Sequence, residues 1–166
     1  MILFKIFYHI NAYIKLLFYR VIYHGKLNVG KNSTFRRNFS LMIGNQGKVT
    51  IGKNCFFNNS CSLNALGEIF IGKGTIFGEN VKIYDHNHRF NIFSKSIKEQ
   101  GFSVGKVYIG NHCWIGSNVV ILKDSVIEDN CVIGAGCVIS GHIKKKSLVR
   151  LHNNYSLEEI KERDLN

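Results

Sequence analysis

Two histidines lie in the longest interruption of the repeating pattern of this chain. His86 and His88 follow Asp85 within the segment that separates Ile83 from Ile109. Imidazole titrates near neutral pH, so a histidine can accept a proton as a general base, and a neighbouring carboxylate can orient its ring. A segment this long inside a compact domain is usually functional or disordered. These side chains are therefore the first candidates for a site.

The pattern that this segment interrupts is a six-residue repeat, here called a hexad. Isoleucine recurs at every sixth position over one stretch: Ile109, Ile115, Ile121, Ile127, Ile133 and Ile139. A six-residue step would scatter these side chains around a helix, whereas an even step keeps them on one face of an extended chain. The position four residues after each of them is small or aliphatic. The pattern predicts a parallel β-helix in which three hexads form one coil.

The repeat continues less regularly towards the N-terminus. Its apolar positions there are Val29, Phe35 and Leu41, then Ile51, Phe57 and Leu63, then Ile71, Phe77 and Ile83. The first two steps between coils exceed eighteen residues, which predicts small insertions near 45–47 and 65–67. A solenoid tolerates insertions best at its corners.

Composition limits the choice of partner and compartment. The 166 residues are 45% hydrophobic and 20% charged, which suits one domain with a buried core. The net charge of +11 favours anionic partners. The basic residues are interpreted as dispersed, and no nucleic-acid-binding motif is visible, so nucleic acid is not an expected partner.

The five cysteines share one position in the hexad, four residues after its leading apolar residue: Cys55, Cys61, Cys113, Cys131 and Cys137. They are expected to be small core residues, because zinc sites usually contain a closely spaced cysteine pair and disulfides need an oxidising compartment. This usage suits a reducing cytoplasm.

The N-terminal residues 1–24 are apolar and aromatic but carry Lys5, Lys15 and Arg20. No uncharged stretch reaches the ~20 residues that span a bilayer, and no small-residue cleavage site follows. A helix is expected there. It would cap the open end of the coil, pack against a neighbouring subunit or rest on a membrane. The expected location is the cytoplasm, with peripheral contact at the inner membrane surface as the alternative.

The hexads, the stretch 85–89 and the stretch 109–117 together resemble the hexapeptide-repeat acyltransferases. The likeness covers 27–143 and is greatest to the sugar O-acetyltransferases of the galactoside and maltose branch. It implies an all-β solenoid, a left-handed parallel β-helix, assembled as a homotrimer with active sites between subunits. The expected domains are a helical segment over 1–26, the acetyltransferase domain over 27–143 with a protruding loop over 84–106, and a basic tail with a short helix over 144–166.

The resemblance also implies roles for individual residues. His88 is the expected general base, because it lies five residues after a hexad-leading apolar residue, and His86 is its rival. Asp85 is the candidate for orienting the imidazole or contacting substrate. Trp114 is expected to border the active site and the donor, and Asn58 to contact the acceptor.

Acetyl-CoA is the implied donor, with Ser117 and Ala135 beside its pantetheine arm and Gly116 allowing close approach. The usual segment after the last coil is not recognisable, and Lys144 is the candidate for the phosphates. Each of these positions has a plainer alternative in corner geometry or a solvated turn. His112 and His142 should face outwards, and no metal site is expected.

The expected function is direct acetyl transfer from acetyl-CoA to a hydroxyl of a bacterial surface-glycan sugar, such as capsule, O-antigen or a precursor. One alternative is an N-acetyltransferase acting on an amino-sugar nucleotide, for which no separate nucleotide-binding domain is visible. The other is a non-catalytic β-helix for assembly or membrane-surface binding. A long loop with paired histidines argues against that reading.

Overall fold

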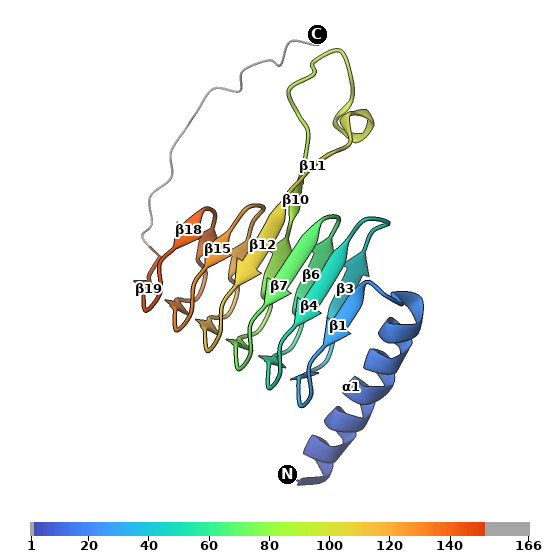
Figure 1. Ribbon diagram of the computed structural model, residues 1–166, viewed down its shortest axis with the longest axis vertical. Coiled ribbons are helices and arrows are strands. Elements are labelled where there is room, and N and C mark those ends of the chain that lie inside the picture. Colours follow the sequence, from blue (N-terminus) through green and yellow to red (C-terminus); the bar gives the residue numbers. More distant parts are fainter. Residues whose placement is uncertain (1, 152–166) are drawn as a thin grey trace.

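The computed structural model describes residues 2–151, in which one helix precedes a solenoid of three parallel sheets (Figure 1). Sheet A contains β1 (Leu27–Val29), β4 (Lys48–Ile51), β7 (Glu68–Ile71), β12 (Lys106–Ile109), β15 (Val126–Ile127) and β18 (His142–Ile143). Sheet B contains β2 (Thr34–Phe35), β5 (Phe56–Phe57), β8 (Ile76–Phe77), β13 (Trp114–Ile115), β16 (Val132–Ile133) and β19 (Leu148–Val149). Sheet C contains β3 (Ser40–Ile43), β6 (Ser62–Ala65), β9 (Lys82–Tyr84), β14 (Val120–Ile121) and β17 (Val138–Ile139).

Each coil passes through sheets A, B and C in turn, so the three corners of the prism are named AB, BC and CA. Successive coils stack in register. Ile51 pairs with Ile71 in sheet A, Phe57 with Phe77 in sheet B and Leu63 with Ile83 in sheet C. The predicted solenoid of hexads is confirmed.

The core is the column of side chains that the hexads point inwards. The isoleucines at 109, 115, 121, 127, 133 and 139 are all buried, the least so at 4% exposed. The five cysteines are equally buried and none is disulfide-bonded. Several of their thiols donate to backbone carbonyls of the next coil, as Cys61 does to Gly78 at 3.2 Å. The prediction that they fill the core is confirmed.

The corners depend on residues that tolerate a left-handed backbone. Many of these positions, three residues after the apolar residue that leads a hexad, are asparagines with φ between 57° and 62°: Asn32, Asn38, Asn54, Asn80, Asn118 and Asn130. Asparagine adopts this conformation more readily than most residues. The recurring asparagines therefore turn the chain from one sheet to the next.

All three insertions emerge from the CA corner. The two short ones span 44–47 and 66–67, close to where the sequence predicts them. The long one runs over 85–105 and forms an antiparallel hairpin of β10 (His86–His88) and β11 (Phe102–Val104), with a 3-10 turn, η1 (Ile97–Gln100), near its tip. In Figure 1 this hairpin stands out from the prism above β7 and β12. Its first residues carry the candidate histidines.

The first coil is covered by α1 (Ile2–Ile22). The hydroxyl of Tyr19 donates to Phe39 O and accepts from Leu41 N, both at 3.3 Å. Lys15 donates to Phe39 O as well, and Arg20 donates to Val29 O at 3.1 Å. The helix therefore satisfies backbone groups that the first coil leaves without a neighbouring strand.

No helix within residues 2–151 has both the length and the hydrophobicity needed to cross a membrane. The short helix predicted in the C-terminal tail falls within 152–166 and lies outside the described residues.

Candidate functional site

The site is built around a buried carboxylate at the CA corner. Asp85 is fully buried at the root of the hairpin. Its Oδ1 accepts the backbone N–H of Leu66 at 2.8 Å, and its Oδ2 accepts that of Gly67 at 2.7 Å. Its own carbonyl accepts the N–H of Gly105 at 2.8 Å. Asp85 therefore joins both strands of the hairpin to the preceding coil.

His86 is held by that carboxylate. Its Nδ1 lies 2.9 Å from Asp85 Oδ1, and its side chain is only 11% exposed. A carboxylate accepts hydrogen bonds, so this contact favours the tautomer with the proton on Nδ1, in which the neutral ring has its lone pair on Nε2. The rings of Tyr84 and Phe102 meet the imidazole edge-on at 6.4 and 5.2 Å. This arrangement fixes both the tautomer and the orientation of the ring, as a general base requires.

His88 has a different environment. It is exposed, and its ring packs against Phe102 with centroids 4.4 Å apart. Within the described residues its imidazole has no hydrogen-bond partner. His86 and His88 are two residues apart in β10, so both point to the same side of the hairpin. Of these two histidines, only His86 is oriented by a carboxylate.

Four of the predicted ligand contacts lie together at the BC corner: Asn58, Gly116, Ser117 and Ala135. Ser117 Oγ accepts the N–H of Glu79 at 3.1 Å, and Ser117 O accepts the N–H of Gly136 at 2.9 Å. Ala135 is exposed on the next coil. These residues form one column along the edge of the prism.

Asn58 and Gly116 also have structural reasons for their identity. Asn58 Oδ1 accepts from Arg36 Nη1 at 3.2 Å and from the N–H of Asn59 at 2.9 Å. A Cβ on Gly116 would lie 2.6 Å from the backbone nitrogen of Ala135, so close stacking of coils requires glycine there.

Trp114 and Lys144 lie elsewhere on the prism. Trp114 begins β13 and is 55% exposed on the outer face of sheet B. Lys144 follows β18 and is exposed at the AB corner. One copy of the chain therefore does not bring the predicted base together with the donor and acceptor contacts, because the base lies at the CA corner and those contacts lie at the BC corner, on sheet B and at the AB corner.

The two histidines expected on the surface are exposed: His112 at a corner and His142 on sheet A, where its Nε2 lies 2.8 Å from Glu128 Oε1. Residues 2–151 contain no group of three His, Cys, Asp or Glu side chains arranged to hold a metal ion.

Leu66 and Gly67 are the site residues that sequence reasoning missed. The sequence shows an insertion near them, but it does not show that their N–H groups face Asp85. Gly67 also permits a close backbone approach, because a Cβ there would lie 2.3 Å from Gly105 O. The sequence does place a glycine within an insertion, one coil before the histidine-containing loop. That placement is the signal that could have predicted a close contact between the two segments.

Comparison with known proteins identifies chains that resemble this one. The family described as "Bacterial transferase hexapeptide (six repeats)" matches residues 106–141. The chain is 26% identical over 132 residues to WbbJ of Escherichia coli K12, a protein assigned to O-acetyl transfer in lipopolysaccharide biosynthesis, covering 75% of this chain and 67% of WbbJ. It is 30% identical over 116 residues to galactoside O-acetyltransferase of Lactococcus lactis, covering 69% and 54%. Two other curated relatives are covered over only 38% and 49% of their length, so the chain spans only part of several proteins that it resembles.

Solved structures share the architecture. A maltose O-acetyltransferase from Clostridium difficile superposes with a TM-score of 0.60 at 29% identity, over 73% of this chain and 63% of that one. A hexapeptide-repeat acetyltransferase from Vibrio cholerae, solved in complex with acetyl coenzyme A, gives 0.64 at 21% identity, over 73% and 64%. The predicted left-handed parallel β-helix is thereby confirmed as the fold class. The chain therefore carries bacterial transferase hexapeptide repeats over 106–141, and among named proteins it is similar to the galactoside and maltose O-acetyltransferases.

Proposed function

We propose that this protein transfers an acetyl group from acetyl-CoA to a hydroxyl of a bacterial surface-glycan sugar. The observation that carries the proposal is the Asp85–His86 pair, in which a buried carboxylate holds an imidazole at the root of the protruding hairpin. The named O-acetyltransferases among the relatives support the reaction class. The name of WbbJ supports a lipopolysaccharide-type acceptor, with capsule as the other candidate.

In the proposed mechanism His86 is the general base. A sugar hydroxyl is a weak nucleophile at neutral pH, so Nε2 takes its proton as the oxygen attacks the thioester carbonyl. Asp85 stabilises the resulting imidazolium through Nδ1. The carbon–sulfur bond then breaks, and the leaving thiolate of CoA recovers the proton from Nε2. The acetyl group passes directly from sulfur to oxygen, and no acetyl-enzyme is formed.

His86 takes precedence over His88 in this proposal, although spacing along the sequence favours His88. A base must hold one ring nitrogen free and the other fixed, and Asp85 does this for His86 alone. His88 is exposed and can contact the acceptor from the same side of the hairpin.

The proposed active form is a homotrimer with its sites between subunits. The support is the separation of candidate residues within one copy. The imidazole lies at the CA corner, and the column of Ser117 and Ala135 lies at the BC corner. Two parallel prisms in contact would bring the CA corner of one beside the sheet B face and BC corner of the other.

Acetyl-CoA would then lie along the BC column. The exposed corner at Ala135 leaves room for an extended pantetheine arm beside Ser117, and Trp114 would border the thioester. Lys144 and Asn58 are the proposed contacts for the donor phosphates and the acceptor. The Vibrio cholerae acetyltransferase was solved with acetyl coenzyme A bound, which supports the choice of donor. The five free cysteines support a reducing compartment, and we propose the cytoplasm.

The test is CoA release from acetyl-CoA by the purified chain against a panel of acceptors. The panel contains neutral and sialylated oligosaccharides, nucleotide sugars and amino-sugar nucleotides, with mass spectrometry of the products. We expect acetyl esters that form only with acceptor and are absent with His86→Ala.

Three results would overturn parts of the proposal. An acetyl-enzyme that accumulates without acceptor would exclude direct transfer. Acetylation of amines alone would favour the N-acetyltransferase. The absence of acetyl-CoA binding by calorimetry, with no turnover of any acceptor, would favour a non-catalytic β-helix.

A further inference from the structure

The helix α1 is apolar on two opposite faces, and the first coil covers only one of them. The inner face packs through Ala12, Leu16 and Tyr19. The outer face exposes six large apolar side chains, spaced three or four residues apart and between 43% and 78% exposed: Ile10, Tyr13, Ile14, Leu17, Phe18 and Val21. This spacing places them in one stripe along the helix. Soluble monomers rarely expose an apolar stripe of this extent without a partner.

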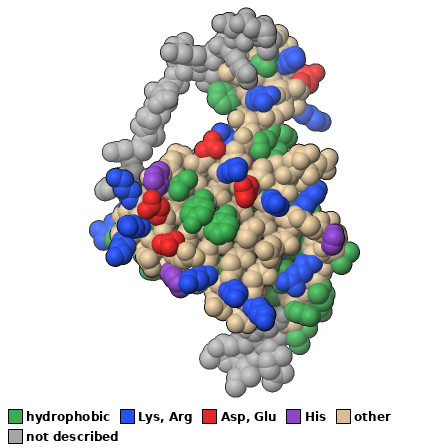
Figure 2. All heavy atoms as spheres, in the orientation of Figure 1, with side chains coloured by type: hydrophobic (Ala, Val, Ile, Leu, Met, Phe, Trp, Pro, Cys, Tyr) green, Lys and Arg blue, Asp and Glu red, His purple; other side chains and the backbone are tan. Residues whose placement is uncertain are grey.

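The charge around this stripe has one sign. Residues 1–67 contain nine Lys and Arg and no Asp or Glu. The remaining 99 residues contain 13 basic and 11 acidic residues, so the net charge of the chain comes almost entirely from its first two coils and α1. The sequence pattern suggests that the basic residues are dispersed. At this end of the solenoid, however, no acidic residue of 1–67 balances them. In Figure 2 Lys and Arg side chains lie beside the hydrophobic ones at this end.

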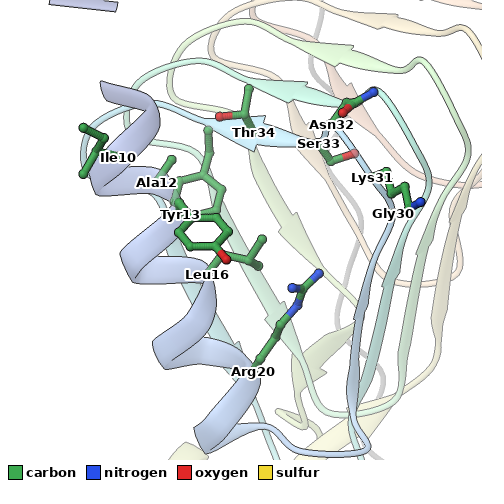
Figure 3. Close-up of a pocket in the computed structure, with 11 residues that line it drawn as sticks. Ile10, Ala12, Tyr13, Leu16, Arg20, Gly30, Lys31, Asn32, Ser33 and Thr34 are labelled. Atoms are coloured by element: carbon green, nitrogen blue, oxygen red, sulfur yellow. The ribbon is translucent and has the colours of Figure 1, made fainter. Parts of the chain in front are cut away.

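Two grooves flank α1 where it crosses the first coil. One, about 740 Å³, is lined by Ile10 and Tyr13 from the stripe together with Arg20 and Lys31 (Figure 3). The other, about 630 Å³, is lined by Ile14 and Phe18 with Lys15, Arg36 and Arg37. Each groove thus joins part of the apolar stripe to cationic side chains. This combination matches an acyl chain attached to an anionic headgroup.

We propose that α1 and these two grooves bind the surface of an anionic lipid bilayer. The helix would lie in the interface with its stripe among the acyl chains, while Lys and Arg on either side contact the phosphates. A second copy docked by its own stripe is the less suitable occupant, because residues 1–67 contain no acidic side chain to face the Lys and Arg beside the stripe. The helix lies on the membrane in this proposal and does not cross it.

The test is flotation of the full chain with vesicles made of equal parts phosphatidylglycerol and phosphatidylcholine, compared with vesicles of phosphatidylcholine alone. We expect at least tenfold stronger binding to the anionic vesicles. Raising salt from about 0.1 M to about 1 M shortens the Debye length from ~10 to ~3 Å and should weaken this binding several-fold. Equal binding to both kinds of vesicle would overturn the proposal, because the excess of Lys and Arg around the stripe would then not contribute to binding.

Matched variants locate the surface. Leu17→Glu/Val21→Glu should reduce binding at least tenfold, whereas Lys98→Glu on the hairpin changes the net charge by the same two units and should reduce it less than twofold. Lys31→Gln/Arg36→Gln, which removes one cation from each groove, should weaken binding to anionic vesicles several-fold. Circular dichroism and thermal unfolding confirm that each variant is folded. Unchanged flotation of folded Leu17→Glu/Val21→Glu would overturn the proposal.

Leu17→Ser/Val21→Ser removes two of the six apolar side chains of the stripe without adding charge, and it distinguishes binding to lipid from binding to a second copy. We expect it to keep the mass of the parent in light scattering while losing vesicle binding. The opposite result is a parent chain that binds no vesicles and a variant whose mass in light scattering is smaller than that of the parent. That result would show that another copy of the chain covers the stripe. Neither measurement depends on acetyl transfer, so the outcome is independent of the proposed function.

Discussion

Asp85 Oδ1 lies 2.9 Å from His86 Nδ1, and both oxygens of that carboxylate also accept backbone N–H groups from the preceding coil. The two residues are neighbours in sequence, yet the preceding coil fixes their geometry. A side chain held in this way loses little rotational freedom when it acts, which is what a positioned base requires. The first two predictions follow from this pair.

Replacement of His86 should abolish the chemical step. His86→Ala removes the proposed base, so we expect kcat/KM for acetyl transfer to fall by about 10²–10⁴-fold. His88→Ala is the matched control, because it removes an imidazole from the same side of β10 that no carboxylate orients, and it should lower activity by less than about tenfold. Steady-state kinetics on both variants, with unfolding curves to verify folding, would distinguish them. A fully active His86→Ala and an inactive His88→Ala would reverse the assignment.

Replacement of Asp85 should affect kcat more than KM. Asp85→Asn keeps the shape of the side chain, but its amide can donate to Nδ1 and favour the wrong imidazole tautomer, so kcat should fall by roughly 10²–10⁴-fold. It also weakens the buried bonds to Leu66 and Gly67, at a cost of about 1–3 kcal/mol in free energy of unfolding. Kinetics and urea denaturation measure the two effects.

Asp124→Asn is the control for that variant, since Asp124 also accepts a backbone N–H at the CA corner, from Lys106 at 3.2 Å, but is exposed. It should change stability by less than about 1 kcal/mol. Full activity in Asp85→Asn would exclude a positioning role for Asp85.

Tyr19 should stabilise the chain through its hydroxyl. Tyr19→Phe leaves the ring packing in place but removes the bonds to Phe39 O and Leu41 N, so we expect a loss of about 1–2 kcal/mol in free energy of unfolding. Tyr13→Phe makes the same chemical change on the exposed face of α1 and should be nearly neutral. Urea denaturation of both would test this, and equal effects would contradict the capping role of Tyr19.

The buried thiols should make the fold sensitive to alkali. Burial raises the pKa of Cys55, Cys61 and Cys113 above the ordinary value of 9.0. The folded state therefore favours the neutral thiol. Its contribution to stability is complete below the pKa of the unfolded chain and declines as pH rises above about 9. Urea denaturation between pH 7 and about 10 should show this decline, and a thiol reagent should label the folded protein far more slowly than the unfolded one.

Cys61→Ser provides the comparison for the alkaline effect. A hydroxyl fits the same hexad position at Ser125, where Oγ lies 2.7 Å from Leu122 O and 3.1 Å from Ile139 O and can donate to either. The variant should therefore fold and should lose less stability on going to high pH. Rapid labelling of all five cysteines in the native parent would contradict their burial.

The helix α1 shows where local pattern was insufficient. Its sequence predicts a helix, but polar residues do not gather on one face, so the buried side was not evident. The structure explains this, because Lys15 and Arg20 lie at the boundaries between two apolar faces and reach backbone carbonyls of the first coil. Which face is buried depends on contact with Phe39 and Leu41, and no helical periodicity contains that information.

The sequence by itself determined the prism, its register and its core. Each hexad from Ile109 to Ile139 makes the same turn and points the same position inwards. The spacing of the isoleucines is therefore a local property, and its repetition along the chain produces the fold. Only the tertiary structure decided which histidine is oriented, because Leu66 and Gly67 reach Asp85 across two stacked coils from 19 and 18 residues away. These hydrogen bonds form between two insertions that leave the same corner from different coils. The spacing of residues along a single coil does not specify how two such insertions contact each other.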